Sequence, residues 1–400
     1  MHISFDITQT FFILAGISLF SSVIIILWEY YNLYILRKSS QESSNTPPLS
    51  PSSTCDISNG VSVIIYSDNN LRNLAQNLPH IISQDYPIFE IIVVNDGKNE
   101  AISDYIYRLS LDHENLHYSY TPDDARNLSR KKLALTIGIK AAKYDIILTT
   151  NSNCCPKSNK WISSIAKHFQ TGTDVVIGYS HISENADTKK WNLLRYFLTL
   201  RNSIKYLTQA ISRKPYRGTS DNLAYRKSLF LKNKGFSHSM HLHYGDDDIF
   251  VNEITTKENT KVEISPDSII LSHFENPERM FQTLALRQSF TERKIHSSAF
   301  VLEYIKILLA VLNIGALISI IAIDYTNVIS IITPIVIAVL YSVFYIIIYR
   351  KTATLLFSRK LLFSIPLFAF IRPIVNIYFN IKSRRHTAHN YTWQSLKNRI

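Results

Sequence analysis

The sequence predicts an α/β domain with a mostly parallel sheet, flanked at both ends of the chain by transmembrane helices. Two observations lead to this prediction. Between residues 60 and 150, apolar runs of strand length alternate with segments of helical periodicity, a pattern typical of parallel sheets wrapped by helices. At the two ends of the 400-residue chain, apolar residues are concentrated in segments long enough to cross a lipid bilayer.

The expected strands and helices begin at about Gly60 and follow one another closely. The apolar runs that predict strands are Val61–Tyr66, Glu90–Val94, Leu116–Tyr120 and Asp145–Thr150. The segments that predict helices between them are Leu71–Ser83, Ala101–Leu111 and Lys131–Lys143. A second half, Trp161–Ser298, adds another helix and a strand at Val175–Tyr179. Within it, Trp191–Ile211 predicts a basic amphipathic helix, which packs on the sheet, lies on a membrane surface or lines a channel.

Three segments with almost no charge predict membrane spans: Thr10–Trp28, Tyr304–Ile323 and Val328–Tyr349. Leu361–Ile381 is also apolar, but it contains two prolines and an arginine, which favours a re-entrant or interfacial segment of open topology. Basic residues follow the first span, the third span and this broken segment. The positive-inside rule therefore places the central domain in the cytoplasm.

These features divide the chain into four expected parts. Residues 1–38 form a retained N-terminal membrane anchor, and residues 39–59, rich in Ser, Pro and Asn, form a flexible linker. Residues 60–298 form the cytoplasmic domain. Residues 299–400 form a C-terminal membrane region with two spans and the broken apolar or interfacial segment.

Charge and cysteine content exclude some classes of function. The net charge of +12 at pH 7 comes from scattered basic residues without a zinc-finger, basic-zipper or RNA-recognition pattern, so we expect no nucleic-acid partner. Membrane lipids with anionic head groups and phosphorylated substrates explain the charge more simply. Cys154 and Cys155 are adjacent and Cys55 lies in the linker, so the cysteines form neither a disulfide framework nor a metal cluster. Reduced thiols agree with a cytoplasmic domain.

Two of the expected strands end in small polar side chains. Glu90–Val94 runs into Asn95-Asp96-Gly97, and Asp145–Thr150 runs into Asn151-Ser152-Asn153. Open α/β sheets bind ligands beyond the carboxyl ends of their strands, so the two tips predict a nucleotide site. The second tip carries amides where a metal-and-phosphate site is expected to carry carboxylates.

Several motifs in one order make a resemblance to a known family specific. They are Val61–Tyr66, Val93-Val-Asn-Asp-Gly97, the helix that starts Lys131-Lys-Leu-Ala, the strand ending at Asn151, Asn222-Leu-Ala-Tyr-Arg-Lys-Ser228 and Gly245-Asp-Asp-Asp-Ile-Phe-Val251. Over about residues 60–295, the chain resembles membrane-anchored family 2 glycosyltransferases of the cellulose- and hyaluronan-synthase-like clan. The resemblance implies a GT-A fold, a nucleotide-sugar donor and an inverting transfer of a hexosyl group.

For the donor, the resemblance implies that Asp96 holds the base and ribose, because a carboxylate accepts hydrogen bonds from hydroxyl and N–H groups. Lys131 and Lys132 match a basic pair at a helix start that would meet the donor phosphates. Two simpler interpretations stay open. Asp96 can be an ordinary turn residue before Gly97, and the lysines can be solvated surface residues.

Three asparagines stand where relatives usually carry acids in the donor site: Asn70 after the first strand, and Asn151 and Asn153 in place of the Asp-x-Asp motif. The second acid of that motif binds a divalent cation, Mg²⁺ or Mn²⁺, which bridges the diphosphate. An amide oxygen can ligate such a cation but supplies no negative charge. We therefore expect the cation site at Asn153 to be weakened or absent.

On the acceptor side, Gly245-Asp246-Asp247-Asp248 matches the segment that supplies the general base, and Asp247 is assigned this role by its position. Adjacent acids would raise the pKa of at least one of them. The alternative is an acidic cap on the following helix. The residues expected to support the site or the acceptor are Asp246, Asp248, Asn222, Arg287 and Gln288, and His243 is expected to make a structural hydrogen bond.

The sequence thus favours a glycosyltransferase in a bacterial inner membrane, which uses a nucleotide sugar to extend a lipid-linked or polysaccharide acceptor. The altered donor motif supports a second hypothesis, in which the fold persists as a binding or complex-organising subunit with little or no catalysis. A membrane scaffold without a ligand is the third. The identity of the sugar, the nucleotide and the acceptor does not follow from fold-level similarity.

Overall fold

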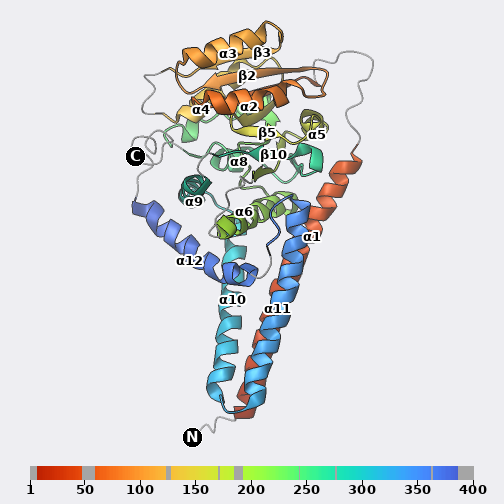
Figure 1. Cartoon of the computed structure of the whole chain (residues 1–400), viewed down its shortest axis with the longest axis vertical. Helices are drawn as coiled ribbons and strands as arrows, with labels where there is room; N and C mark the ends of the chain where they lie inside the picture. The colour runs from red at the N-terminus through yellow and green to blue at the C-terminus, as the bar shows by residue number, and fades with distance from the viewer. Residues whose placement is uncertain are drawn as a thin grey trace.

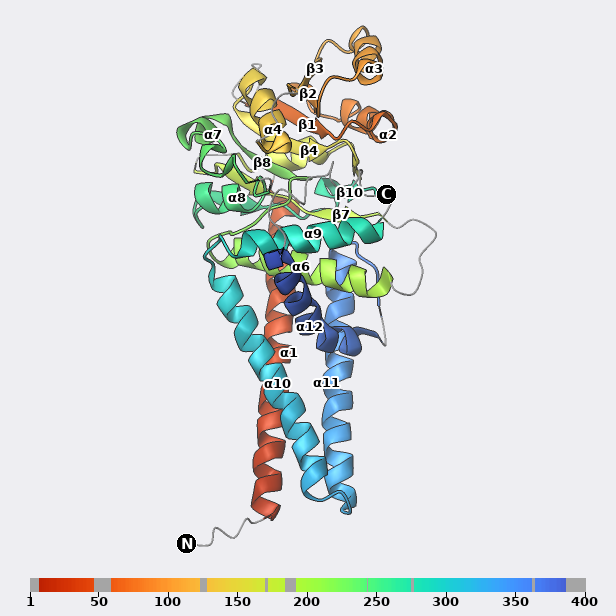
Figure 2. The same cartoon turned by 90° about the vertical axis from the view of Figure 1, so that its left-hand side faces the viewer.

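The computed structural model describes residues 7–46, 59–122, 128–169, 172–183, 192–242, 244–274, 277–361 and 364–385. An α/β domain stands at one end of the molecule, and long apolar helices run away from it at the other (Figure 1). Helices α6 (Asn192–Ser212) and α9 (Pro277–Glu292) lie across the junction between the two parts (Figure 2).

The larger sheet has seven strands in the order β3-β2-β1-β4-β8-β6-β9. Its members are β1 (Val61–Ser67), β2 (Phe89–Asn95), β3 (Leu116–Tyr120), β4 (Ile146–Asn151), β6 (Val175–Ile177), β8 (Leu223–Arg226) and β9 (Thr260–Val262). Strands β1 to β4 pair in parallel, β9 is parallel to β6, and β8 runs antiparallel to both β4 and β6. The prediction of a mostly parallel α/β sheet is confirmed.

Helices cover both faces of this sheet. Every residue of β1 is buried, as expected for a central parallel strand with a continuous apolar run. Val61, Val63 and Ile65 pack on the side of α2 and α3, whereas Ile64 and Tyr66 pack on the side of α4. The helices of the domain are α2 (Leu71–Ile82), α3 (Glu100–Ser110), α4 (Arg130–Ala141), α5 (Trp161–Ala166), α7 (Lys227–Lys232) and α8 (Ile249–Ile254), with 3-10 turns at Ser237–Ser239 and Pro266–Ser268.

A second sheet of three strands lies next to the large one. It consists of β5 (Cys154–Pro156), β10 (Ile270–Ser272) and β7 (Ser180–Ile182), in the order β5-β10-β7. The backbone N–H of His273, which follows β10, donates to the carbonyl oxygen of Asn153 at 2.8 Å. This sheet therefore fixes the turn after β4, where a candidate site was expected.

In the part of the chain that the structure describes, four helices are long and apolar enough to cross a membrane: α1 (Ile7–Asn45), α10 (Ser298–Ile323), α11 (Val328–Leu355) and α12 (Ser364–Arg385). The first three contain the three segments predicted as spans, and α1 packs against both α10 and α11. Within the segment predicted to be broken, 361–381, the residues from Ser364 onward belong to one continuous helix, α12, with Pro373 inside it. Helix α12 is inclined to the other three and packs on α9 (Figure 1).

Helix α1 extends beyond the predicted anchor into the expected linker. Its last residues, up to Asn45, are helical, and Ser39, Ser40 and Ser43 are buried. Lys167, at the end of α5, donates from Nζ to the backbone oxygen of Ser43 at 2.6 Å. Such tertiary contacts are invisible to a prediction made from composition. Residues 47–58 of the expected linker lie outside the described residues.

The helical part and the α/β domain share one hydrophobic core. The cluster that includes Ile64 of β1 continues through Phe197 of α6 to Tyr349 and Ala353 of α11 and to Leu36 of α1. Charges reinforce this junction, because Arg201 of α6 donates from Nη2 to Oε1 of Glu29 on α1 at 2.8 Å. Lys306 of α10 forms an ion pair with the same buried carboxylate.

Candidate active site

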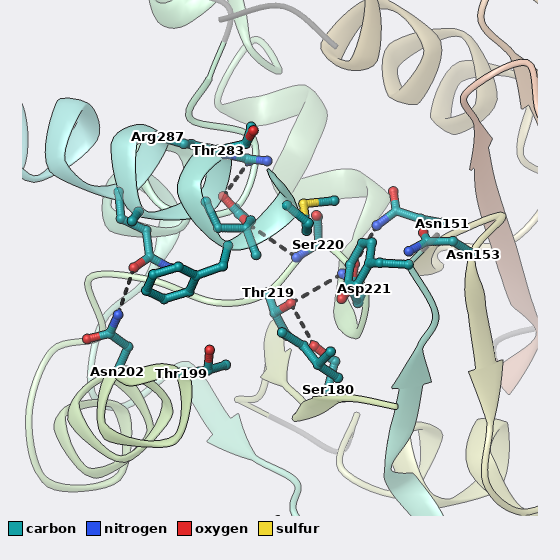
Figure 3. Close-up of a pocket in the computed structure, with 18 of the residues that line it drawn as sticks. Asn151, Asn153, Ser180, Thr199, Asn202, Thr219, Ser220, Asp221, Thr283 and Arg287 are labelled. Atoms are coloured by element: carbon teal, nitrogen blue, oxygen red, sulfur yellow. Dashed lines mark hydrogen bonds and ion pairs between the residues drawn. The ribbon is translucent and has the colours of Figure 1, made fainter. Parts of the chain in front are cut away.

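A cavity of about 450 Å³ lies beyond the carboxyl ends of β1 and β4, between the sheet and helices α6, α9 and α12. The upper wall comes from the strand ends and from the loop at 217–221. The lower wall combines polar and apolar side chains, and its apolar members include Leu198 of α6, Met280 and Leu284 of α9, and Val375 and Phe379 of α12. The position agrees with the general placement of ligands in open α/β sheets. Figure 3 shows part of this cavity.

The tips of β1 and β4 form one side of the cavity. Asn151 and Asn153 line it, as expected from the sequence, together with Asn70 and Asp68 from the end of β1. Asn70 also caps α2, because its side-chain oxygen accepts a hydrogen bond from the backbone N–H of Asn73 at 3.1 Å. Ser152 donates from Oγ to Oδ1 of Asp68 at 3.2 Å, which links the two tips. Asp68 had not been singled out, although it follows β1 as Asp96 follows β2.

Asp96 does not line the cavity but contacts Tyr66, which does. Tyr66, which lines the cavity, donates from Oη to Oδ2 of Asp96 at 3.2 Å, and Arg130 forms an ion pair with Oδ1. Asp96 is half-buried and is not among the lining residues. Its carboxylate therefore orients Tyr66 and Arg130, while the next residue, Gly97, makes the turn with a φ of 88°.

Of the two adjacent lysines, only Lys131 reaches the cavity. Its Nζ lies 3.1 Å from Oδ2 of Asp246 and 2.7 Å from Oγ of Ser220. The expectation that Lys132 binds the donor is wrong for this geometry. The Lys132 side chain is fully buried and donates from Nζ to the carbonyl oxygens of Ser239, Leu242 and Tyr244. Burial lowers the pKa of Lys132 to about 8, and the ammonium fixes the loop that precedes the acidic triplet.

The three acids of the triplet have three different environments. Asp246 is buried between Lys131 and Arg287; burial favours a higher pKa, but the two cations outweigh it and hold the pKa well below its usual range. Asp248 caps α8, because its Oδ1 accepts from the N–H of Ile249 at 2.7 Å. The interpretation of the triplet as a helix cap thus holds for Asp248.

Asp247 is the member of the triplet with both a cavity position and a raised pKa. Its Oδ1 lies 2.8 Å from Nη2 of Arg287, and its Oδ2 accepts from the backbone N–H of Ser220 at 3.4 Å. Burial raises the pKa of Asp247 to about 6, and Asp246 and Asp248 add to the rise while Arg287 opposes it. Titratable groups tuned toward neutral pH are typical of proton acceptors in catalysis.

The backbone before the triplet requires a glycine. Gly245 has a φ of 107°, which L side chains rarely adopt, and an added Cβ would lie 2.7 Å from Cδ1 of Ile249. The turn sends Asp247 into the cavity. His243, expected to make a structural hydrogen bond, lies outside the described residues.

The loop between α6 and β8 supplies an acid that the sequence analysis did not single out. Asp221 lines the cavity and accepts hydrogen bonds from Nδ2 of Asn151 and, at 2.7 Å, from Oγ of Ser272. Its neighbour Asn222 is fully buried instead, and its amide donates to the carbonyl oxygens of Tyr179 and Ser268. Asn222 therefore supports the loop from behind and does not line the cavity.

Helix α9 brings Arg287 and Gln288 into the cavity, as expected. Arg287 bridges Asp246 and Asp247, and Gln288 accepts from Nδ2 of Asn202 on α6 at 3.0 Å. Among the residues that the structure describes, no group of three or more His, Cys, Asp or Glu side chains could hold a metal ion. The cavity thus combines a polar upper wall, a carboxylate with a raised pKa and a lower wall that is partly apolar.

Comparison with known proteins adds a family match that covers part of the chain. Residues 62–232 match the family described as Glycosyl transferase family 2, so the chain carries a family 2 glycosyltransferase domain. The matched region contains both strand tips and Asp221, and it ends before the acidic triplet.

Among curated proteins, the poly-beta-1,6-N-acetyl-D-glucosamine synthase of Staphylococcus epidermidis is 27% identical over 94 residues, which cover 24% of this chain. The match spans only 22% of that relative's length.

Two solved structures are similar to this chain. Mannosyltransferase PcManGT from Pyrobaculum calidifontis, solved with GDP-Man and Mn²⁺, has a TM-score of 0.51 at 14% identity and covers 91% of this chain and 99% of its own. Residues 1–349 of S. aureus TarS, solved with UDP-GlcNAc, have a TM-score of 0.41 at 13% identity, covering 83% and 91%. The first of these supports the GT-A fold expected from the sequence.

Proposed function

We propose that the protein is a membrane-bound inverting glycosyltransferase that moves a sugar from a nucleotide-sugar donor to a lipid-linked or polysaccharide acceptor. The observation that carries the proposal is the position of Asp247. Its carboxylate, with a pKa raised to about 6, lines the same cavity as the tips of β1 and β4. The same cavity thus contains a carboxylate that would serve the acceptor hydroxyl and polar strand ends that would meet the donor phosphates.

In the proposed reaction, Asp247 accepts the proton of an acceptor hydroxyl while the hydroxyl oxygen attacks the anomeric carbon. A new bond forms between that carbon and the acceptor oxygen as the bond to the donor diphosphate breaks, and the nucleoside diphosphate leaves. Attack from the face opposite the diphosphate inverts the anomeric configuration. The pair with Arg287 keeps Asp247 oriented and favours its ionised form before the acceptor arrives.

The acceptor enters from the side of the helices that form the lower wall of the cavity, α6, α9 and α12. On α12, outward residues such as Phe370 and Ile377 are exposed. Exposed apolar residues of this kind suit a lipid environment. The proposal therefore places the helical part in a bacterial inner membrane, with lipids as neighbours and the α/β domain on the cytoplasmic side, as the positive-inside rule predicts.

A divalent cation is the cofactor that the family implies, and the residues at the β4 tip fit one. The side-chain oxygen Oδ1 of Asn151 is buried and has no hydrogen-bond partner among the described residues. Mg²⁺ is commonly bound through one or two carboxylates together with substrate phosphates, and Asp221 supplies one carboxylate here. Asn151, Asn153 and Asp221 would hold the ion, which would neutralise charge on the departing diphosphate.

A specific observation also favours a second function. Both acids of the Asp-x-Asp motif are amides in this chain, which lowers the negative charge at the donor tip. If catalysis is lost, the cavity would still bind a nucleotide, and the protein would act as a binding or complex-organising subunit.

Turnover and binding separate the two functions. The full chain in lipid nanodiscs would be incubated with UDP- and GDP-sugars, Mn²⁺ and a bacterial lipid extract, and release of nucleoside diphosphate would be measured. We expect turnover that falls about 10²–10⁴-fold in Asp247→Asn, the range for loss of a general base. As a matched control, Asp267→Asn removes an exposed acid and should leave the rate unchanged. Nucleotide binding without turnover would favour the binding subunit, and the absence of both would contradict both functions.

A further inference from the structure

Asp221 faces the amide-bearing tip of β4 from a separate part of the chain. The two meet because β8, which follows Asp221, pairs antiparallel with β4. The loop is held firmly, since Gly218 donates from its backbone N–H to the carbonyl oxygen of Asp247 at 2.7 Å and Asn222 is fixed by buried hydrogen bonds. Figure 3 shows Asp221, Asn151 and Asn153 together on one side of the cavity.

Asp221 differs from the acidic triplet in how its negative charge is balanced. Asp246, Asp247 and Asp248 are matched by Lys131, Arg217 and Arg287, which lie within ion-pair distance of them. The side-chain partners that the structure gives Asp221 are Asn151 and Ser272, both neutral. No ion pair joins Asp221 to a cationic side chain in the described ranges. Because no cationic side chain balances its charge there, the Asp221 carboxylate is available to bind a cation from outside the protein.

The two asparagines provide further oxygen ligands. Asn151 points Nδ2 at Asp221, which leaves its buried Oδ1 without a partner in the described part of the chain. A buried polar atom without a partner is unfavourable, because it has lost its contact with water without gaining a hydrogen bond in the protein. Oδ1 of Asn153 accepts a weak contact, at 3.8 Å from Sγ of Cys154. A half-turn of the Asn151 side-chain amide would exchange the positions of its oxygen and nitrogen. The oxygen would then lie beside the Asp221 carboxylate, where a bound cation would contact both.

We propose that Asp221 supplies the anionic ligand of a divalent-cation site that it forms with the amide oxygens of Asn151 and Asn153. One carboxylate and neutral oxygens bind Mg²⁺ or Mn²⁺ weakly on their own, and the diphosphate of the donor completes the site. The cation and the nucleotide therefore bind cooperatively. The inference rests on the proposed function, since it assumes that a nucleoside diphosphate occupies the cavity.

Binding measurements test this site without relying on turnover. Affinity for Mn²⁺ would be measured by electron paramagnetic resonance on the full chain in nanodiscs, with and without saturating UDP or GDP. Nucleotide affinity would be measured by calorimetry with and without Mn²⁺. We expect each ligand to tighten the binding of the other by the same factor. Melting curves would confirm that every variant is folded.

Three variants isolate the role of Asp221. Asp221→Asn removes the charge with little change in shape and should weaken Mn²⁺ binding at least about tenfold, because even changes beyond the ligands cost about 10–100-fold in metal affinity. The double variant Asp221→Asn with Asn153→Asp returns a carboxylate to the tip and should restore Mn²⁺ binding. Asp267→Asn, the exposed control, should bind Mn²⁺ like the unaltered chain.

The outcomes distinguish failure of this site from failure of the proposed function. Nucleotide binding that is independent of Mn²⁺, or unchanged Mn²⁺ affinity in Asp221→Asn, would overturn the role of Asp221 and leave the donor cavity standing. Absence of UDP and GDP binding under every condition would overturn both. Loss of Mn²⁺ binding in Asp221→Asn and its return in the double variant would establish the ligand.

Discussion

At the residue scale, neighbouring side chains of the same type differ in role because the backbone turns them toward different surroundings. Asp246, Asp247 and Asp248 are consecutive, yet they neutralise two cations, line the cavity and cap a helix, respectively. Lys131 and Lys132 also differ in role, because Lys131 lines the cavity whereas Lys132 is buried and donates to backbone carbonyl oxygens. Successive residues of a helix point about 100° apart, so a single position decides which lysine meets the cavity.

The pKa of Asp247 predicts the pH dependence of the proposed reaction. A carboxyl with a pKa raised to about 6 is protonated, and inactive as a base, below that pH. We expect kcat/KM to be constant above about pH 6 and to fall as the pH drops through it. Asp246→Asn removes a neighbouring negative charge and frees Lys131 and Arg287 to act on Asp247, so the acidic limb should move to lower pH. A pH–rate profile checks this, and a limb that stays in place or moves upward would refute the assignment.

Whether a site residue could be predicted from the sequence depends on the type of contact that it makes. Asn151, Asn153 and Asp247 were found because each belongs to a motif next to a strand or helix end. Asp221 was not singled out, since its contact with Asn151 depends on the pairing of β8 with β4, which is non-local. Likewise, the burial of Asn222 follows from bonds to Tyr179 and Ser268, which no local pattern encodes.

At the element scale, the five predicted strands agree with β1, β2, β3, β4 and β6 to within about one or two residues, the usual uncertainty of element boundaries. The short strands β5, β7, β8, β9 and β10 were not predicted. The continuous apolar runs of β1 and β2 indicate burial on both faces. The prediction was less complete for α1 and α12. Helix α1 continues into a Ser-rich segment because buried contacts hold it, and α12 accommodates Arg372 by an ion pair with Glu303 of α10 at 2.7 Å.

The close packing of α4 on β1 gives a prediction for stability. An added Cβ at Gly138 would lie 2.6 Å from Cγ2 of Ile64 and 3.1 Å from Cγ2 of Val94, so the buried strands would have to shift. We expect Gly138→Ala to lower the free energy of unfolding by about 1–3 kcal/mol, the typical cost of overpacking. Gly315→Ala in α10 is the matched control, because its Cβ meets nothing within 4 Å and alanine favours helices. Chemical denaturation of the two variants measures the difference, and equal stability would argue against this packing.

At the scale of the whole molecule, the α/β domain and the helical part form one body through a shared core and a buried charge cluster. Glu29, Arg201 and Lys306 belong to α1, α6 and α10, which are far apart in the sequence. The apolar helices also contribute to the cavity. Helix α12 lines it directly, and α1 holds α6, which lines it too, through the contact between Glu29 and Arg201.

Removal of Glu29 should loosen this junction. In Glu29→Gln, Arg201 and Lys306 would be left buried without their anion, and breaking a buried ion pair on one side costs about 3–5 kcal/mol. We expect a clear fall in the melting temperature in nanodiscs and weaker nucleotide binding. Glu42→Gln removes an exposed acid from the same helix and should change little. If both variants melt alike, the junction does not depend on this cluster.

A structure of the full chain with a nucleotide sugar and Mn²⁺ bound would test the central claim, that one cavity brings the donor and the base together. The account predicts that the diphosphate lies at the tip formed by Asn151, Asn153 and Asp221, with the anomeric carbon turned toward Asp247 on the face opposite the diphosphate. A nucleotide bound elsewhere, or an anomeric carbon whose open face points away from Asp247, would contradict it.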